Sequence, residues 1–365
     1  MIDFAGRDRR TVNYLKTVYF ARPEWTPARV YFLPSAWMKH RERLEELVLS
    51  HPRLFPGFRK GSVDYDFKSG VWGNPLYELG RHTDCWGTVW NNIARGFDSQ
   101  VDVEPLADWS AFDAWKKRAP DPEADDSFGP RNWAAVAKSM ADAKARGGLA
   151  SCGPLMHGFF FMRLYYLRGF ENLLLDIADD DPRLRELIAV VENYSAAVVR
   201  RALDLGAEEI GFAEDLGMQT SLPISPAAWR KFVKPTYEAT IGQCRKRGIL
   251  AGLHSDGHIL EIIGDLIETG VTLLNPQFRA NGLAGLRQYA RGKVALSQDL
   301  DRQLFPFATP REIEDHVGEV FEGLYLRKGG LILQAEFGPD VPLDNAEALC
   351  RTMEKLCRLP EPAEA

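Results

Sequence analysis

The sequence predicts an α/β protein: a closed (β/α)₈ TIM barrel with an irregular, aromatic-rich N-terminal extension. Two observations favour this fold. From about residue 181 onward, short and nearly continuous apolar runs alternate with helical segments, as expected of parallel strands buried on both faces. Several such units follow one another, which is typical of a barrel. The alternative is a doubly wound open sheet, but no Gly-x-Gly-x-x-Gly follows any of the runs, which disfavours its nucleotide-binding form.

Composition excludes several other classes of protein. The 365 residues are 45% hydrophobic and 26% charged, which is ordinary for a globular chain. The net charge of −6 and the lack of a basic stripe argue against a nucleic-acid partner. No apolar run reaches the roughly 18 residues that a membrane helix needs. Residues 1–10 are too charged for a signal peptide, and the five cysteines form no Cys-x-x-Cys pair. We therefore expect a reduced, cytoplasmic protein that does not bind a membrane.

We expect a single domain over residues 1–365. Residues 1–150 would form the N-terminal elaboration and the first barrel elements, 151–358 the regular βα units, and 359–365 a frayed tail. No repeat, low-complexity tract or Gly/Ser linker divides the chain.

Capping residues mark three helix starts in the regular part. Asp181-Pro182 provides a cap and a first-turn proline for a long amphipathic helix. Ser225-Pro226 opens a second helix, in which Pro235 predicts a kink. Thr309 and Glu312 have the spacing of a capping box at the start of a third.

Polar residues follow each predicted strand. The strands are Ile210–Ala213, Ile249–Leu253, Val271–Leu274, Val294–Leu296 and Leu331–Leu333. The residues that follow them are Glu214 and Asp215, His254 to Asp256, Asn275 to Gln277, Gln298 and Asp299, and Gln334 to Glu336. Because a barrel builds its site at the C-terminal ends of its strands, we expect these side chains to converge on one pocket. Strand ends are often polar for structural reasons alone, which would account for one or two of them.

His254 and Asp256 are candidate metal ligands. Residues two apart in a strand point to the same face, so the imidazole and the carboxylate could share a metal ion or a substrate proton. Glu336 is the candidate third ligand. One nitrogen and two oxygens would suit Zn²⁺ or another divalent metal. The alternative is that the His-x-Asp pair is structural.

The remaining candidate residues have roles in catalysis and substrate binding. Asp215, Asp299 and Asp256 are candidate catalytic groups, which would stabilise charge or transfer a proton. The candidate substrate-binding residues are Glu214, Asn275, Gln277, Gln298 and Trp86. For Trp86, packing in the core is the alternative.

Taken together, these motifs resemble the uroporphyrinogen decarboxylase-like superfamily, which includes corrinoid-dependent methyltransferases and barrels similar to cobalamin-independent methionine synthase. The resemblance extends from about residue 72 to residue 349 and implies a (β/α)₈ barrel. It rests on Asp84 to Trp90, Glu214 to Gln219, Ser225 to Pro235, His254 to His258, Asn275 to Gln277, Asp301 to Gln303 with Thr309-Pro310, and Pro342 to Asn345.

The resemblance implies methyl transfer between a corrinoid and a folate, a thiol or a small methylated substrate. Thiol-directed members hold zinc with a His-x-Cys pair and a later cysteine; here His254 matches the histidine, Asp256 replaces the first cysteine, and Glu336 falls near the second. Folate-directed members need no zinc, and Asp215, Asn275 and Gln277 would then contact the pterin. We expect a methyltransferase with methylcobamide as co-substrate and a corrinoid protein as partner. The sequence leaves open whether the protein forms a homodimer.

Two alternatives remain open. The first is a cofactor-free decarboxylase of a porphyrinogen or another acidic substrate, with Asp215 or Asp299 stabilising the protonated intermediate. True uroporphyrinogen decarboxylases bind the carboxylates of their substrate with an Arg-Gln-Ala-Gly-Arg segment, which this sequence lacks. Its absence argues against this alternative, because burying unpaired carboxylates costs several kcal/mol each. The second is a catalytically inactive barrel that binds a ligand. The carboxylates at several strand ends argue against it, because an idle pocket would gain nothing from their mutual repulsion.

Overall fold

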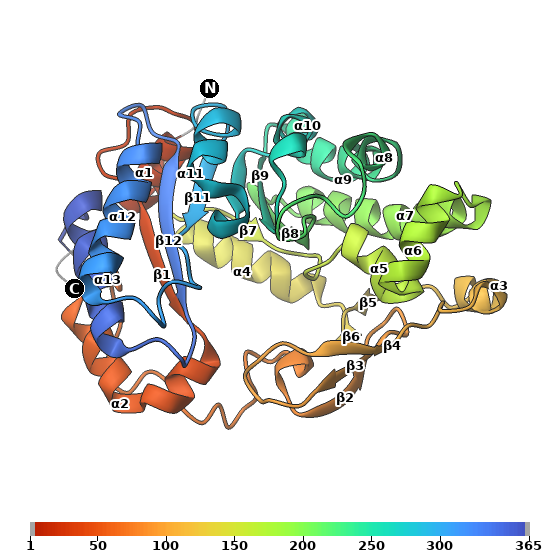
Figure 1. The fold of residues 1–365 in the computed structure, drawn as a ribbon, viewed down its shortest axis with the longest axis horizontal. Coiled ribbons are helices and arrows are strands. Elements are labelled where there is room, and N and C mark those ends of the chain that lie inside the picture. Colours follow the sequence, from red (N-terminus) through yellow and green to blue (C-terminus); the bar gives the residue numbers. More distant parts are fainter. Residues whose placement is uncertain (1–3, 362–365) are drawn as a thin grey trace. The chain divides into compact units, whose positions relative to one another are not determined.

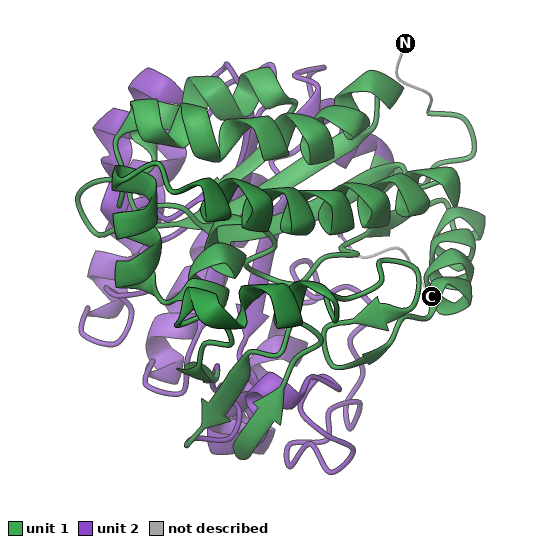
Figure 2. Ribbon diagram, turned by 90° about the vertical axis from the view of Figure 1, so that its right-hand side faces the viewer, with its two compact units in different colours: residues 1–11, 79–93, 99–275 green, residues 12–78, 94–98, 276–365 purple. Residues whose placement is uncertain are grey.

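The computed structural model describes residues 4–361, so the first three residues and the part of the expected frayed tail from 362 to 365 lie outside the described residues. The chain divides into two compact units, each an α/β structure (Figures 1 and 2). The first unit comprises residues 1–11, 79–93 and 99–275, and the second comprises 12–78, 94–98 and 276–365. Each unit draws on both the N-terminal and the regular part of the sequence. The expectation of a single domain stays a prediction.

Four parallel strands run through the first unit, and three of them carry polar strand ends that the sequence predicted. In the order of the sheet they are β7 (Ser151–Cys152), β8 (Glu209–Asp215), β9 (Leu250–Asp256) and β10 (Leu273–Pro276), the last residue of which opens the second unit. The parallel register of β8 and β9 places Ala213 opposite His254 and Asp215 opposite Asp256. Three of the predicted strands are therefore confirmed here, and β7 is a short additional one.

The register of β8 and β9 and the alternation of side chains along each strand determine the face of the sheet on which each side chain lies. Ile210, Phe212 and Glu214 of β8 are buried together on one face, and Asp215 lies on the opposite face. Since paired residues share a face, His254 and Asp256 of β9 point to the same side as Asp215. One face of the strand pair is thus buried and mostly apolar, with Glu214 and its partner Ser255 as polar exceptions, and the other carries the candidate site.

The predicted helix starts in the first unit are confirmed. Asp181 caps α7 (Pro182–Asp204) by accepting a hydrogen bond from the Arg183 backbone N–H. Ser225 caps α8 (Pro226–Phe232), and the helix breaks at Val233, beside Pro235, before α9 (Lys234–Arg247). The other helices are α3 (Phe112–Lys116), α4 (Trp133–Ala145), α5 (Phe161–Arg168), α6 (Phe170–Ala178) and α10 (Ile263–Thr269). The shorter strands are β2 (Gly80–Thr83), β3 (Val89–Asn92), β4 (Gln100–Val103), β5 (Asp125–Asp126) and β6 (Gly129–Pro130).

The second unit contains a parallel sheet with the strand order β1, β12, β11. The predicted strands are present as β11 (Ala295–Asp299) and β12 (Leu331–Phe337), and β1 (Ala28–Phe32) comes from the N-terminal part of the sequence. Thr309 and Glu312 form the expected capping box at the start of α12. The helices are α1 (Arg9–Val18), which begins in the first unit, α2 (Pro34–Ser50), α11 (Phe278–Tyr289), α12 (Pro310–Leu324) and α13 (Leu343–Cys357).

The α/β class is therefore observed, while closure of the strands into a complete barrel stays a prediction. Within residues 4–361, none of the helices has the length and apolar character needed to cross a bilayer.

Candidate functional site

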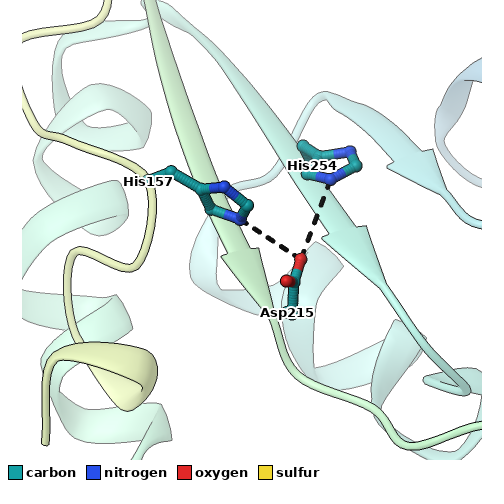
Figure 3. Close-up of side chains that lie close together, drawn as sticks. All are labelled: His157, Asp215 and His254. Atoms are coloured by element: carbon teal, nitrogen blue, oxygen red, sulfur yellow. Dashed lines mark hydrogen bonds and ion pairs between the residues drawn. The ribbon is translucent and has the colours of Figure 1, made fainter. Parts of the chain in front are cut away.

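Two histidines and one aspartate converge on a single point in the first unit (Figure 3). The Nε2 atom of His157 lies 3.2 Å from Oδ1 of Asp215, and Nε2 of His254 lies 3.8 Å from the same oxygen. Figure 3 shows both imidazoles pointing toward this carboxylate, one from a loop and one from β9. One potential ligand atom from each residue lies within 4.8 Å of the others. No other cluster of three or more His, Cys, Asp or Glu residues has metal-binding spacing within the described chain.

A second carboxylate adjoins this group. Oδ1 of Asp256 lies 3.8 Å from Nε2 of His254, and the Asp256 backbone N–H donates a 3.3 Å hydrogen bond to Oδ1 of Asp215. The register of β8 and β9 explains the proximity, because it pairs the two aspartates directly. The structure therefore brings together Asp215, His254 and Asp256, three residues that the sequence predicted to share a pocket.

Asn275 fixes the orientation of the His254 ring. The distance between Nδ1 of His254 and Oδ1 of Asn275 is 2.7 Å. Since the amide oxygen only accepts hydrogen bonds, Nδ1 is the donor in this contact, and the ring is turned so that Nε2 faces the two aspartates. An outer partner of this kind is usual for a metal-binding histidine. Asn275 thus contacts a site residue, and its predicted contact with a substrate stays a prediction.

A backbone crossing holds the ends of β8 and β9 in place. The Gly217 N–H donates to the Asp256 carbonyl at 3.3 Å, and the His258 N–H donates to the Met218 carbonyl at 2.8 Å. A Cβ atom on Gly257 would lie 2.0 Å from the Gly217 carbonyl oxygen, and Gly257 has a φ of +81°. Only glycine fits this approach, so the two loops are locked together immediately beyond Asp215 and Asp256.

The electrostatics favour the ionised form of Asp215. Burial acts to raise the pKa of Asp215, but the hydrogen bond and charge of His157 and the charge of His254 outweigh it and hold that pKa below its ordinary value. Asp215 is therefore ionised at neutral pH. An ionised carboxylate between two imidazole nitrogens suits a divalent cation.

His157 is the site residue that the sequence analysis missed. It lies in the loop that follows β7, and Asp215 is the last residue of β8, so the rule that polar residues at and beyond strand ends form the site applies to His157 as well. The signal was weak because β7 has only two residues and leaves no apolar run to detect.

Glu214 and Trp86 lie in buried environments. The Glu214 side chain accepts hydrogen bonds from the backbone N–H groups of Phe160 at 2.5 Å and Phe161 at 2.8 Å. Burial raises the pKa of Glu214 to about 7, although both N–H donors act in the opposite direction. The Trp86 ring is stacked 6.1 Å from the Trp115 ring and is 4% exposed. Substrate binding by Glu214 and Trp86 stays a prediction.

The other predicted residues lie in the second unit. Gln298 is fully buried, and its amide donates to the carbonyls of Pro276 and Asp299. Gln277 precedes α11 as its N-cap residue. Glu336 of β12 forms a 2.9 Å ion pair with Arg302. The catalytic, substrate-binding and metal-binding roles expected of these residues stay predictions.

The donor set of the first unit fits a divalent metal ion. His157, Asp215 and His254 offer two nitrogens and one oxygen, the number of protein ligands that catalytic zinc sites use. Two histidines and a carboxylate also suit other first-row metals such as iron. The three side chains keep 50%, 32% and 29% of their surface exposed, so a substrate could reach a metal held there.

A protein family and several solved structures are similar to this chain. The family described as uroporphyrinogen decarboxylase (URO-D) matches residues 158–356, which is more than half of the chain. The match includes Asp215, His254, Asp256 and Asn275 and begins immediately after His157. No curated protein sequence matches the chain.

Among solved structures, a methyltransferase from Methanosarcina mazei is similar over 97% of this chain and 99% of its own, with a TM-score of 0.58 and 15% identity. At this identity the likeness shows a common fold. A dihydropteroate synthase from Xanthomonas albilineans is 14% identical over 46% of this chain and 62% of its own, with a TM-score of 0.32. The latter likeness is too partial to support an argument.

Proposed function

The chain belongs to the uroporphyrinogen decarboxylase family, and from this premise we propose that it is a methyltransferase that uses a divalent metal ion held by His157, Asp215 and His254. The observation that carries the proposal is the convergence of two imidazole nitrogens on one ionised carboxylate. The fold likeness to a methyltransferase over nearly the whole chain supports this branch of the family.

The metal ion, when bound, supplies a Lewis acid that favours the deprotonated form of a methyl acceptor. Residues of this chain orient and charge the side chains that would hold the metal ion. Asn275 binds Nδ1 of His254 and so turns Nε2 toward the two aspartates, and Asp215 is already ionised at neutral pH. Zinc fits this set without a cysteine, because catalytic zinc sites commonly use histidine and carboxylate ligands.

Asp256 is the residue we assign to proton transfer. It lies beside the cluster, 3.8 Å from Nε2 of His254. In the proposed reaction the acceptor loses its proton to the Asp256 carboxylate and attacks the methyl carbon of a methylated corrinoid. The new bond joins acceptor and methyl group, and the electron pair of the broken cobalt–carbon bond stays on cobalt. We propose a folate or a thiol as the methyl acceptor, or, in the opposite direction, a small methylated compound that gives its methyl group to the reduced corrinoid; in both cases a corrinoid protein is the partner.

We also propose that the strands of both units form a closed (β/α)₈ barrel. The parallel strands of each unit and the likeness over 97% of the chain to a solved methyltransferase support this arrangement. A barrel would bring the strand ends of the second unit, with Asp299 and Glu336, to the same rim.

Metal analysis combined with a methyl-transfer assay tests the function. Freshly purified protein is analysed by mass spectrometry for bound metals, and demethylation of methylcob(III)alamin is followed spectroscopically with tetrahydrofolate or a thiol. We expect about one metal ion per chain and a loss of at least about 100-fold in activity in H157A and H254A. His40, which contacts the Pro339 carbonyl in the second unit, provides the matched control H40A.

The rival functions predict different results. Release of carbon dioxide from uroporphyrinogen without a metal requirement would establish a decarboxylase instead. Ligand affinity that survives in H254A and D256N, with no turnover of any substrate by the wild type, would indicate a binding protein. Full metal content and activity in H157A would refute the proposed site.

A further inference from the structure

Glu214 occupies a position where an apolar residue would be expected. It shares the buried face of β8 with Ile210 and Phe212 and has no exposed surface. Burying a carboxylate costs several kcal/mol unless its oxygens are well paired, and a leucine at this position would avoid that cost. The carboxylate therefore needs an explanation beyond stability.

Two backbone hydrogen bonds join Glu214 to one segment of the chain. Phe160 and Phe161 donate to it with their backbone N–H groups at the start of α5, an eight-residue helix. The first N–H groups of a helix have no partner within the helix and carry partial positive charge, so a carboxylate is a strong acceptor there. Glu214 thus joins β8 to the beginning of α5.

The segment held in this way carries His157. Three consecutive residues of β8 bind it. The Ala213 carbonyl accepts from the Gly158 N–H at 2.9 Å, Glu214 binds the two N–H groups of α5, and the Asp215 N–H lies 2.9 Å from the Met162 sulfur. His157 is adjacent to the first of these contacts, and Asp215 makes the last. These contacts therefore flank the pair of His157 and Asp215, whose side chains lie 3.2 Å apart.

We infer that Glu214 is a positioning residue that holds His157 against Asp215 by fastening residues 158–161 to β8. This gives Glu214 a role different from the substrate contact expected from the sequence. The inference deepens the proposed function and rests on it in one respect, since His157 affects chemistry only if the cluster binds a metal. The placement of His157 itself can be measured without metal.

The variant E214Q tests the hydrogen-bonding role of Glu214 while it keeps the size and the buried location of the side chain. A glutamine has nearly the same size, but only its amide oxygen can accept; its NH₂ group would face one of the two N–H donors. We expect Zn²⁺ affinity, measured by competition with a chromophoric chelator, to fall by about 10–100-fold, as for other outer-shell partners of metal ligands.

A double-mutant cycle shows whether Glu214 acts through His157. If it does, E214Q should cause no further loss of Zn²⁺ affinity in an H157A background. The control is D265N, which alters a buried carboxylate paired with Arg230 and Lys234 and should leave Zn²⁺ affinity unchanged. Unchanged affinity in E214Q, or an equal loss in both backgrounds, would overturn the inference.

A metal-free measurement keeps this test separate from that of the proposed function. In chelator, we expect amide hydrogen exchange at Phe160 and Phe161 to be about ten-fold faster in E214Q, because their acceptor is weakened. The imidazole ¹⁵N shifts of His157 should move toward those of the D215N variant, in which the contact is lost. If neither changes, the inference fails. If the wild type binds no metal, the proposed function fails, and these two readouts still decide the role of Glu214.

Discussion

The close approach of two loops at Gly217 and Gly257 allows us to predict how much stability the variant G257A loses. The new methyl group would lie 2.0 Å from the carbonyl oxygen and 2.1 Å from the carbonyl carbon of Gly217. Both are backbone atoms, so no side chain can rotate away to make room. The loops must separate, and the Gly217 and His258 N–H groups lose their acceptors on the opposite loop.

The expected loss of stability is the sum of two effects. A non-glycine residue at a φ of +81° costs about 1–2 kcal/mol, since the left-handed region crowds Cβ. Breaking the two backbone hydrogen bonds costs about 1 kcal/mol each. We therefore expect G257A to lower the free energy of unfolding by about 3–4 kcal/mol, a large share of the roughly 5–15 kcal/mol that stabilises a typical domain.

Gly206 provides the matched control. Its φ is +92°, but a Cβ atom there would meet no other atom within 4 Å. G206A should therefore show only the conformational cost of about 1–2 kcal/mol. Urea unfolding in chelator, monitored by tryptophan fluorescence, gives both values. A G257A variant that differs from G206A by less than about 0.5 kcal/mol would refute the reasoning, because that is within the range of an ordinary surface substitution.

Two further predictions concern histidines. N275A should weaken metal binding by about 10–100-fold, because the His254 ring loses the hydrogen-bond partner that fixes its orientation, and titration calorimetry would show this; unchanged affinity would exclude the orienting role. For His316, burial lowers the pKa below its ordinary value of 6.5, and its Nε2 accepts a 3.0 Å hydrogen bond from the Asp301 N–H. The folded protein therefore prefers the neutral ring, so this contribution to stability is present above the ordinary pKa and is lost as the pH falls below it. The urea midpoint should drop between about pH 7.5 and about pH 5 more in the wild type than in H316Q.

Local patterns in the sequence were sufficient for several helices and strands of the regular part. Capping residues such as Asp181 and Thr309 mark helix starts because they satisfy backbone groups within a few residues. The apolar runs of β8 and β9 identify strands because burial on both faces requires continuous apolar residues. The same logic failed for β7, whose two residues are too few to show a pattern.

The candidate site was predicted in part. Asp215, His254 and Asp256 could be grouped from the sequence because each stands at the end of a strand, and parallel strand ends meet at one edge. His157 could not be added, since its place depends on a loop tied to β8 by hydrogen bonds between residues more than 50 positions apart. The burial of Glu214 also depends on the strand register, because a shift of one residue would have turned its side chain toward the site.

The sequence by itself determined the α/β class, the family and the presence of acidic and imidazole side chains at neighbouring strand ends, because these follow from periodicity and short motifs. Only the tertiary structure decided which atoms meet: Nε2 of His157 with Asp215, Nδ1 of His254 with Asn275, and the Glu214 carboxylate with the start of α5. Such contacts depend on strand register, loop closure and ring orientation. These are set by packing and hydrogen bonds between segments far apart in the chain, and no local pattern records them.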